Sequence, residues 1–220
     1  MPQNLALSTA FAHVTDWVFD LDNTLYPPSV RLFDQIEARM RSYVMTHLNL
    51  PFAEADHLRK HYWRTYGTTL SGLMREHGID PAPFLKDVHD ISFDALKPDP
   101  DLAHLIKNLP GRCIVYTNGT KPYAEQVLSA RGLSDLFENI YGIEHANHLP
   151  KPERAAFEQV FSQDGLTPTN AAMFEDEARN LEVPHALGLR TVHVAPDAST
   201  ADYVQFHTDD LTAFLRQISA

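Results

Sequence analysis

An apolar stretch near the start of the chain ends in two carboxylates. The run Trp-Val-Phe is followed by Asp20, one leucine and Asp22. An apolar run rich in β-forming residues indicates a buried strand, and the next residues, Asn23 and Thr24, favour turns and caps. The pattern predicts a strand over residues 17–21 that delivers both aspartates into a loop, the position at which α/β sheets place their chemistry.

Helical periodicity dominates the part of the chain that follows. From Ser29, the expected N-cap, apolar residues recur at helical spacing as far as Asn49, and nothing between Pro27 and Lys97 has the pattern of a strand. We therefore predict an all-helical cap domain, residues 26–96, inserted over the loop that carries the aspartates. This prediction includes later helices at about 53–66, 68–77 and 82–90, and hinges near residues 25–28 and 94–98.

Beyond the predicted cap, apolar strand patterns alternate with amphipathic helices. Such alternation implies right-handed crossovers and a parallel sheet with helices on both faces. We predict an α/β fold in which residues 1–25 and 97–220 form a Rossmann-like, three-layer core, with residues 1–16 as no more than a short lead-in. The expected strands lie at 112–117, 139–143, 171–174 and 190–194, and the expected helices at 99–109, 122–131, 153–163, 179–187 and 208–218.

Polar residues follow several of the predicted strands. Thr117 and Asn118 come after the second strand, Lys151 lies between two prolines at a helix start, and Glu175 and Asp176 open an acidic loop. Each feature alone is common in turns and caps, but the carboxyl ends of parallel strands share one edge of a sheet. Carboxylates brought that close need a cation, and oxygen ligands without a thiolate cluster favour Mg²⁺.

Composition narrows the choice of partners and compartment. Lys and Arg number 18 against 29 Asp and Glu, a formal net charge of −11, which repels nucleic acid and anionic membranes. We expect a small anionic substrate, no nucleic acid polymer or membrane partner, and a monomer or weak homodimer. No apolar run is long enough to span a membrane and no signal peptide is evident, so the prediction is a cytoplasmic protein. The single cysteine, Cys113, lies in an apolar run and is expected to be buried.

Taken in order, the polar clusters resemble the four motifs of the haloacid dehalogenase-like (HAD) phosphohydrolase superfamily. The helical insertion after the first motif is similar to the first cap class of that superfamily. Three segments also resemble its pyrimidine 5′-nucleotidase branch: residues 20–27, residues 66–73 and the triplet ending at Asp176. The superfamily motifs are Asp20-Leu21-Asp22-Asn23-Thr24, Thr117-Asn118, Lys151-Pro152, and Glu175-Asp176 followed by Asn180.

The resemblance implies a Mg²⁺-dependent phosphomonoester hydrolase that acts on pyrimidine nucleoside 5′-monophosphates such as UMP or CMP. Asp20 would be the nucleophile that forms an aspartyl-phosphate, and Asp22 the general acid and base. The ion would be held by Asp20, the backbone carbonyl of Asp22 and Asp176. Thr117 and Asn118 would bind the phosphate, and Lys151 would offset the charge that Asp20 shares with it.

Three further residues would support these groups without themselves binding the ion. They are Thr24, Glu175 and Asn180. The family's last motif usually offers two acidic groups and a later aspartate, whereas here Glu175 precedes Asp176 and Asn180 occupies the later position. Asn180 is therefore expected to orient a ligating water, and Glu175 to act as a partner of the ligands.

Several alternatives remain open at this point. A sugar-phosphate phosphatase or phosphomutase of the same superfamily would share every core motif, because lid residues choose the leaving group. A non-catalytic domain that binds Mg²⁺ and phosphate, or a signalling domain, is the alternative from another class. Tyr62, Trp63 and Tyr66 fit either base stacking or the core of the cap, and a solvated helix face is the favoured interpretation of the basic residues Arg59, Lys60, Arg64 and Arg75.

Overall fold

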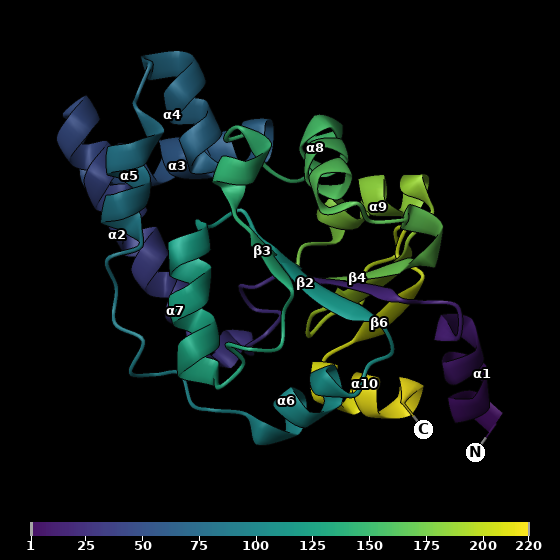
Figure 1. Ribbon diagram of the computed structural model, residues 1–220. Coiled ribbons are helices and arrows are strands. Elements are labelled where there is room, and N and C mark those ends of the chain that lie inside the picture. Colours follow the sequence, from purple (N-terminus) through teal and green to yellow (C-terminus); the bar gives the residue numbers. More distant parts are fainter. Residues whose placement is uncertain (1, 220) are drawn as a thin grey trace.

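A single parallel sheet forms the centre of the molecule. The computed structural model describes the backbone of residues 2–219 and the side chains of residues 7–219. Within that range six parallel strands are arranged in the order β3-β2-β1-β4-β5-β6 (Figure 1). The predicted α/β fold is thus confirmed. The strands are β1 (Asp16–Phe19), β2 (Arg112–Tyr116), β3 (Asn139–Tyr141), β4 (Ala171–Glu175), β5 (Arg190–Val194) and β6 (Phe206–Thr208).

Strand β1 lies in the middle of the sheet and separates two apolar cores. It pairs with β2 on one side and with β4 on the other, so both of its edges are hydrogen-bonded within the sheet. Successive side chains of a strand point to opposite faces. Accordingly Trp17 and Phe19 belong to the larger core, whereas Val18 belongs to the smaller one. The strand ends at Phe19, two residues earlier than predicted, and this leaves Asp20 and Asp22 in the loop.

Helices cover both faces of the sheet and complete three layers. Residues of α1, α6, α7 and α10 pack in the larger core, and residues of α8 and α9 pack in the smaller one. Among the described residues, no helix is both long and apolar enough to cross a bilayer. Cys113 lies buried in β2, as expected. The bounds are α1 (Pro2–Phe11), α6 (Pro100–Lys107), α7 (Lys121–Arg131), α8 (Arg154–Asp164), α9 (Glu182–Leu187) and α10 (Leu211–Ile218), with short 3-10 helices η2 (Ile143–Ala146), η3 (Pro168–Asn170) and η4 (Ala178–Leu181).

Four helices, α2 to α5, form an insertion between β1 and α6. They follow a 3-10 turn, η1 (Pro28–Val30), and pack mainly against one another, α3 on α4 and α2 on both α3 and α5. In Figure 1 this helical insertion lies beyond one end of the sheet. Gly72 of α4 permits a close approach of α3, because a Cβ at that position would lie 2.1 Å from Cγ of Tyr62. The helices are α2 (Leu32–Leu48), α3 (Phe52–Tyr66), α4 (Thr69–His77) and α5 (Pro81–Val88).

Both segments that join the insertion to the sheet are held by one buried arginine. Arg131, the last residue of α7, donates to the carbonyl of Leu25 at 3.1 Å and to the carbonyl of Lys97 at 2.5 Å. Its guanidinium also contacts the carboxylate of Asp99 at 2.7 Å. The entry and the exit of the insertion are therefore tied to the same point of the core.

The structure corrects several sequence predictions. Helix α1 occupies part of the segment expected to be a lead-in, and the expected 179–187 helix is divided between η4 and α9. Ser29 does not cap α2, because it lies within η1 and the N-cap position is taken by Arg31 with a left-handed φ of 57°. Strand β6 was not predicted: its three residues at the sheet edge are each half-buried and form no apolar run.

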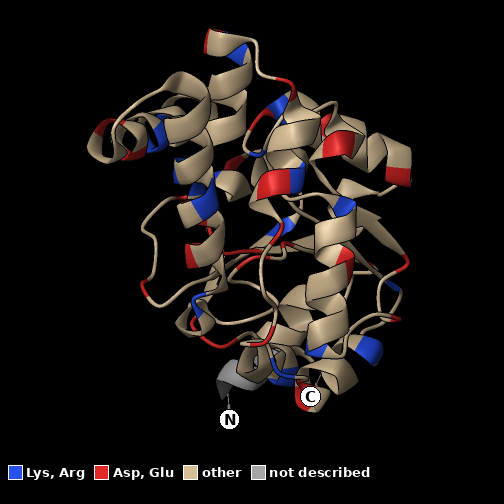
Figure 2. Cartoon of the chain, turned by 90° about the vertical axis from the view of Figure 1, so that its left-hand side faces the viewer, with Lys and Arg blue, Asp and Glu red and all other residues tan. Residues whose placement is uncertain are grey.

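Charged residues are intermixed over the surface. In Figure 2, Lys and Arg alternate with Asp and Glu along the helices facing the viewer rather than gathering in one basic face. With a formal net charge of −11, the field around the protein is negative, so an anionic ligand requires locally placed cationic groups.

Candidate active site

A lysine shared by two carboxylates lies at the carboxyl end of β1. Lys151 is 1% exposed, and its Nζ lies 2.6 Å from Oδ1 of Asp20 and 2.6 Å from Oε2 of Glu175. A third hydrogen bond runs from Nζ to the backbone carbonyl of Tyr116 at 3.0 Å. All three donors of the ammonium group are thus used, and a charge that is costly to bury is compensated on each side.

Asn118 fixes the backbone of this lysine. Its side-chain amide donates to the carbonyl of Lys151 at 3.1 Å, and its Oδ1 accepts from the amide of Lys151 at 2.8 Å. Thr117 lines the cavity beside it, and its Oγ1 accepts from the amide of Gly119 at 2.9 Å. The two residues expected to bind phosphate therefore lie next to Lys151, with the Asn118 amide already engaged in holding the lysine.

The second aspartate of the loop is held by two phenols. Oδ1 of Asp22 accepts a hydrogen bond from the hydroxyl of Tyr26 and another from the hydroxyl of Tyr123, each at 2.6 Å. Burial, followed by the charge of Asp20, raises the pKa of Asp22 to about 6, although the two phenol donors oppose the shift. Asp22 can therefore exchange a proton near neutral pH.

Three acidic residues gather where β1 and β4 end. Asp20, Glu175 and Asp176 each offer a carboxylate oxygen, and these oxygens lie within 4.8 Å of one another. Three carboxylates against the one ammonium of Lys151 leave two negative charges, which a divalent cation would balance. An all-oxygen set of this kind suits Mg²⁺.

The pKa values of this cluster reflect the uncompensated charge. Burial and the charge of Glu175 raise the pKa of Asp20 to about 6, because Lys151, which lowers it, offsets them only in part. Burial and the charges of Asp20 and Glu175 raise the pKa of Asp176 well above its ordinary range. For Lys151, burial acts to lower the pKa, but the two carboxylates outweigh it and raise the pKa.

Amide and hydroxyl side chains support the carboxylates. Thr24 Oγ1 donates to Oδ2 of Asp20 at 3.2 Å, and Asn23 donates to Oδ2 of Asp176 at 3.1 Å. Asn180 donates to Oε1 of Glu175 at 3.0 Å, while its own Oδ1 is buried without a partner among the described residues. A buried acceptor of this kind fits a water bound to an ion, so the residues present are compatible with Mg²⁺.

The helical insertion forms the other side of the site. A cavity of about 450 Å³ is lined both by the carboxylate cluster and by the insertion. Arg59 is 5% exposed and pairs with Glu37 at 3.0 Å, so the interpretation of a solvated helix face is wrong for this residue. The apolar lining from the insertion comprises Phe33, Ile36, Met40, Leu70, Phe84, Leu85 and Val88.

The three aromatic residues of α3 have different environments. Tyr62 is buried in the core of the insertion, and its hydroxyl lies 2.7 Å from Nε2 of His77. Tyr66 is partly buried and donates to Glu76. Trp63, by contrast, is 41% exposed and lines the cavity, with the guanidinium of Arg179 4.1 Å above its ring.

Arg179 connects the acidic loop to the insertion. It lies between Asp176 and Asn180 in sequence and donates to the carbonyls of Trp63 at 3.0 Å and Gly67 at 3.3 Å. Gly67 itself has a φ of +86° and packs closely on the backbone carbonyl of Lys151, which would lie 3.2 Å from an added Cβ. Two independent contacts thus join the end of α3 to the loops that carry Asp176 and Lys151.

The sequence also matches a known family. A model described as haloacid dehalogenase-like hydrolase covers residues 18–188, from β1 to the residue after α9. This chain belongs to that family. The earlier resemblance to HAD proteins is therefore confirmed at the level of the superfamily.

Two curated relatives of this HAD hydrolase are phosphate-related proteins. Phosphate metabolism protein 8 of Saccharomyces cerevisiae is 27% identical over 197 residues, which are 81% of this chain and 61% of the relative. Fructose-1-phosphate phosphatase YqaB of Escherichia coli is 26% identical over 127 residues, 55% of this chain and 66% of the relative. The matched segments span less than two thirds of either relative. The chain is thus a HAD-like hydrolase that has relatives among the phosphatases.

Solved structures share the fold at low sequence identity. HAD-hydrolase YfnB from Bacillus subtilis, in a magnesium-bound form, has a TM-score of 0.62 at 18% identity, covering 94% of this chain and 99% of that one. The HAD phosphatase from Thermococcus onnurineus also has a TM-score of 0.62, at 16% identity, covering 93% and 97%. L-2-haloacid dehalogenase from Xanthobacter autotrophicus has a TM-score of 0.58 at 14% identity, covering 93% and 98%. At these identities the fold is shared by phosphatases and dehalogenases alike.

Sequence reasoning missed some of the residues that complete the site. The sequence marks Tyr26 only as part of a motif and Tyr123 only as part of a predicted helix, 101 positions beyond the aspartate that it contacts. Arg179 lay inside the acidic loop without a predicted partner. A tyrosine in the first turn of the helix after Thr117 and Asn118 was the one available signal, since that helix begins at the same sheet edge.

Proposed function

We propose that this HAD hydrolase is a Mg²⁺-dependent phosphomonoesterase that acts through an aspartyl-phosphate on Asp20. Its substrates are pyrimidine nucleoside 5′-monophosphates, and the helical insertion acts as the cap over the site. Asp20, the backbone carbonyl of Asp22 and Asp176 would hold the ion, with Asn180 and Glu175 supporting them. Bound Mg²⁺ would neutralise charge on the phosphoryl oxygens.

One observation carries the choice of a phosphatase over a dehalogenase. Asp22 provides a partly buried carboxylate two positions from the nucleophile, with a pKa of about 6. Phosphate ester cleavage needs a group that can protonate the leaving oxygen and later accept a proton from water. Displacement of a halide has no such requirement, because halide leaves without a proton.

The residues of the chain can perform both halves of the reaction. Asp20 attacks phosphorus, and the bond from phosphorus to the leaving oxygen breaks as Asp22 donates its proton to that oxygen. In the second half, Asp22 takes a proton from a water whose oxygen attacks phosphorus, and the Asp20 carboxylate is released together with inorganic phosphate. Lys151 offsets the charge on Asp20 throughout, and Thr117 with its neighbouring amides binds phosphate oxygens.

The lining of the cavity supports a nucleoside as the leaving group. The insertion contributes an apolar wall from α2 and α5, together with the exposed ring of Trp63. A flat base buries apolar area against such a wall, whereas the polar residues that also line the cavity from the insertion, among them Glu37, Lys60 and Arg64, could pair with the hydroxyls of a sugar. The relative that acts on fructose 1-phosphate makes a sugar phosphate the competing candidate.

Phosphate release from a substrate panel tests this proposal. We expect turnover of UMP and CMP above that of AMP and fructose 1-phosphate, loss of turnover in a chelator, and its return on adding Mg²⁺. Asp20→Asn and Asp176→Asn should abolish turnover, while Asp101→Asn, a change at an exposed carboxylate, should leave it unchanged. Faster turnover of fructose 1-phosphate would favour the sugar phosphatase, and no turnover by the folded protein would overturn the hydrolase assignment.

A further inference from the structure

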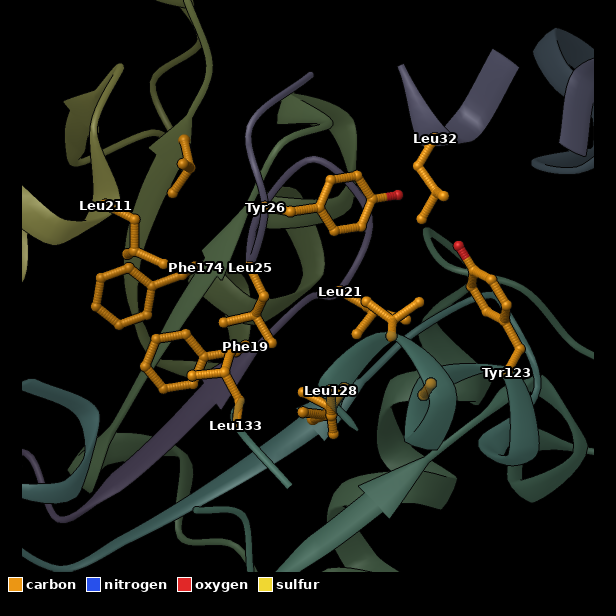
Figure 3. Packing of buried hydrophobic residues seen from close by; sticks show 14 of the residues in the cluster. Phe19, Leu21, Leu25, Tyr26, Leu32, Tyr123, Leu128, Leu133, Phe174 and Leu211 are labelled. Atoms are coloured by element: carbon orange, nitrogen blue, oxygen red, sulfur yellow. The ribbon is translucent and has the colours of Figure 1, made fainter. Parts of the chain in front are cut away.

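The carboxylate of Asp22 is held in an asymmetric way. Both phenol donors, from Tyr26 and Tyr123, contact the same oxygen, Oδ1, at 2.6 Å each. Among the described residues, no hydrogen bond reaches Oδ2. In Figure 3 the hydroxyls of Tyr26 and Tyr123 point toward the same space from two different parts of the chain.

This asymmetry decides where Asp22 can carry a proton. A carboxylate oxygen offers two lone pairs, and two short O–H donors occupy both lone pairs of Oδ1. A phenol keeps its proton at neutral pH, so both tyrosines remain donors. A proton on Oδ1 would have to displace one of them, whereas a proton on Oδ2 displaces nothing.

We propose that Tyr26 and Tyr123 are positioning residues that reserve Oδ1 of Asp22, so that Oδ2 alone exchanges the catalytic proton. This inference rests on the proposed phosphatase reaction. In the first half the O–H bond at Oδ2 breaks as the leaving oxygen gains that proton and its bond to phosphorus breaks. In the second half Oδ2 gains a proton from the attacking water.

The surroundings of both tyrosines suit a fixed orientation. Each is 1% exposed. Tyr26 lies between the aspartate loop and the insertion, and Tyr123 lies in the first turn of α7, where its amide donates to the N-cap Thr120 at 3.3 Å. His89, just after α5, stacks on the Tyr123 ring with centroids 4.4 Å apart and an interplanar angle of 11°.

The ring of Tyr123 is confined from the core side as well. A Cβ added to Gly119 would lie 2.8 Å from Cδ1 of Tyr123, so the glycine leaves only enough room for the ring. With His89 on a face of the ring and Gly119 close to its edge, the phenol cannot turn away from Asp22 without repacking the end of the insertion. The hydroxyl therefore holds Asp22 from a rigid support.

A purely structural role for these tyrosines makes a different prediction from a positioning role. Both belong to the larger apolar core, and loss of a buried hydrogen bond lowers stability whatever its function. A structural role would reduce the hydrolysis of all substrates equally. A role in placing the proton matters only when the leaving group needs that proton.

The test is the dependence of kcat/KM on the leaving group in Tyr26→Phe, Tyr123→Phe and the double variant. UMP releases a basic alkoxide that requires a proton, whereas p-nitrophenyl phosphate releases nitrophenolate, which departs without one. We expect kcat/KM for UMP to fall about tenfold in each single variant and about a hundredfold in the double variant, within the range that general acid catalysis supplies. For p-nitrophenyl phosphate it should change by less than about threefold.

Two controls separate the possible failures. Asp22→Asn should show the same leaving-group dependence in a stronger form. If the wild-type enzyme is active but Asp22→Asn affects both substrates equally, the general acid role fails and the positioning role fails with it. Tyr141→Phe removes a comparable phenol donor to a carboxylate, Asp164 at 3.0 Å, away from the site, and should change neither substrate.

The remaining outcomes bear on the tyrosines alone. Equal losses on both substrates in the Tyr→Phe variants, or no loss on UMP while Asp22→Asn behaves as expected, would overturn the positioning role and leave the phosphatase intact. If Tyr123→Phe does not fold, Tyr26→Phe decides the question, because its hydroxyl contacts the same oxygen from outside α7.

Discussion

Replacing Lys151 by methionine should expose how much of the site depends on one cation. The side chain is 1% exposed and its Nζ lies 2.6 Å from both Asp20 and Glu175. Methionine keeps much of the volume but removes the charge, so two buried carboxylates lose their partner. Breaking a buried ion pair in this way costs about 3–5 kcal/mol of the free energy of unfolding. We expect the loss in free energy of unfolding caused by Lys151→Met to lie in that range.

The assay is denaturant unfolding in the presence of a chelator, so that no divalent cation compensates for the missing ammonium group. Arg154→Met is the matched control, because it removes a cation from a half-exposed pair with Glu158 and should cost no more than about 0.5 kcal/mol. Adding Glu175→Gln to Lys151→Met should restore about 1–3 kcal/mol relative to additivity. A cost below about 1 kcal/mol for Lys151→Met, or strict additivity of the two changes, would refute this account of the site.

Three further predictions concern the insertion and its attachment. Burial lowers the pKa of His89 from 6.5 to about 4, so between these values only the unfolded chain binds the proton, and stability falls as the pH falls. On going from pH 7 to pH 5, wild type should therefore lose about 2 kcal/mol more free energy of unfolding than His89→Gln does. An equal loss in the two proteins would contradict this. Arg131→Met should lower the free energy of unfolding by about 2–3 kcal/mol and speed limited proteolysis at residues 25–28 and 94–98; unchanged cleavage would argue against the arginine as the anchor. Gly72→Ala should cost about 1–3 kcal/mol in denaturant unfolding despite the better helix propensity of alanine, because the added methyl overlaps Tyr62; a gain in stability would show that the helices separate easily.

Local sequence patterns were sufficient for the fold because strand and helix signals alternated strongly. The apolar run before Asp20 indicated a buried strand, and its neighbours β2 and β4 carry similarly continuous apolar runs. One of the two edge strands escaped prediction. Strand β6 has only three residues, each half-buried, so neither alternation nor a continuous apolar run marks it.

The candidate site was predictable as far as its strand ends. Asp20, Lys151 and Asp176 each follow a predicted strand or open a helix at the same edge, and topology alone brings them together. The orientation of the side chains could not be predicted in this way. That Asn118 holds the backbone of Lys151, or that Tyr123 reaches Asp22, depends on loop paths for which one sequence contains no periodic signal.

The contact made by Arg179 gives the acidic loop a second role. This residue lies between Asp176 and Asn180, yet its guanidinium holds two carbonyls of the insertion and covers Trp63. Free-energy coupling between two ligands is reciprocal. Suppose that a cation bound at the carboxylates strengthens the contact of this arginine with α3 and thereby raises the affinity for a nucleoside that packs against α3. The nucleoside must then raise the affinity for the cation by the same factor. Nucleoside binding measured at several cation concentrations and cation binding measured at several nucleoside concentrations would then give one and the same number.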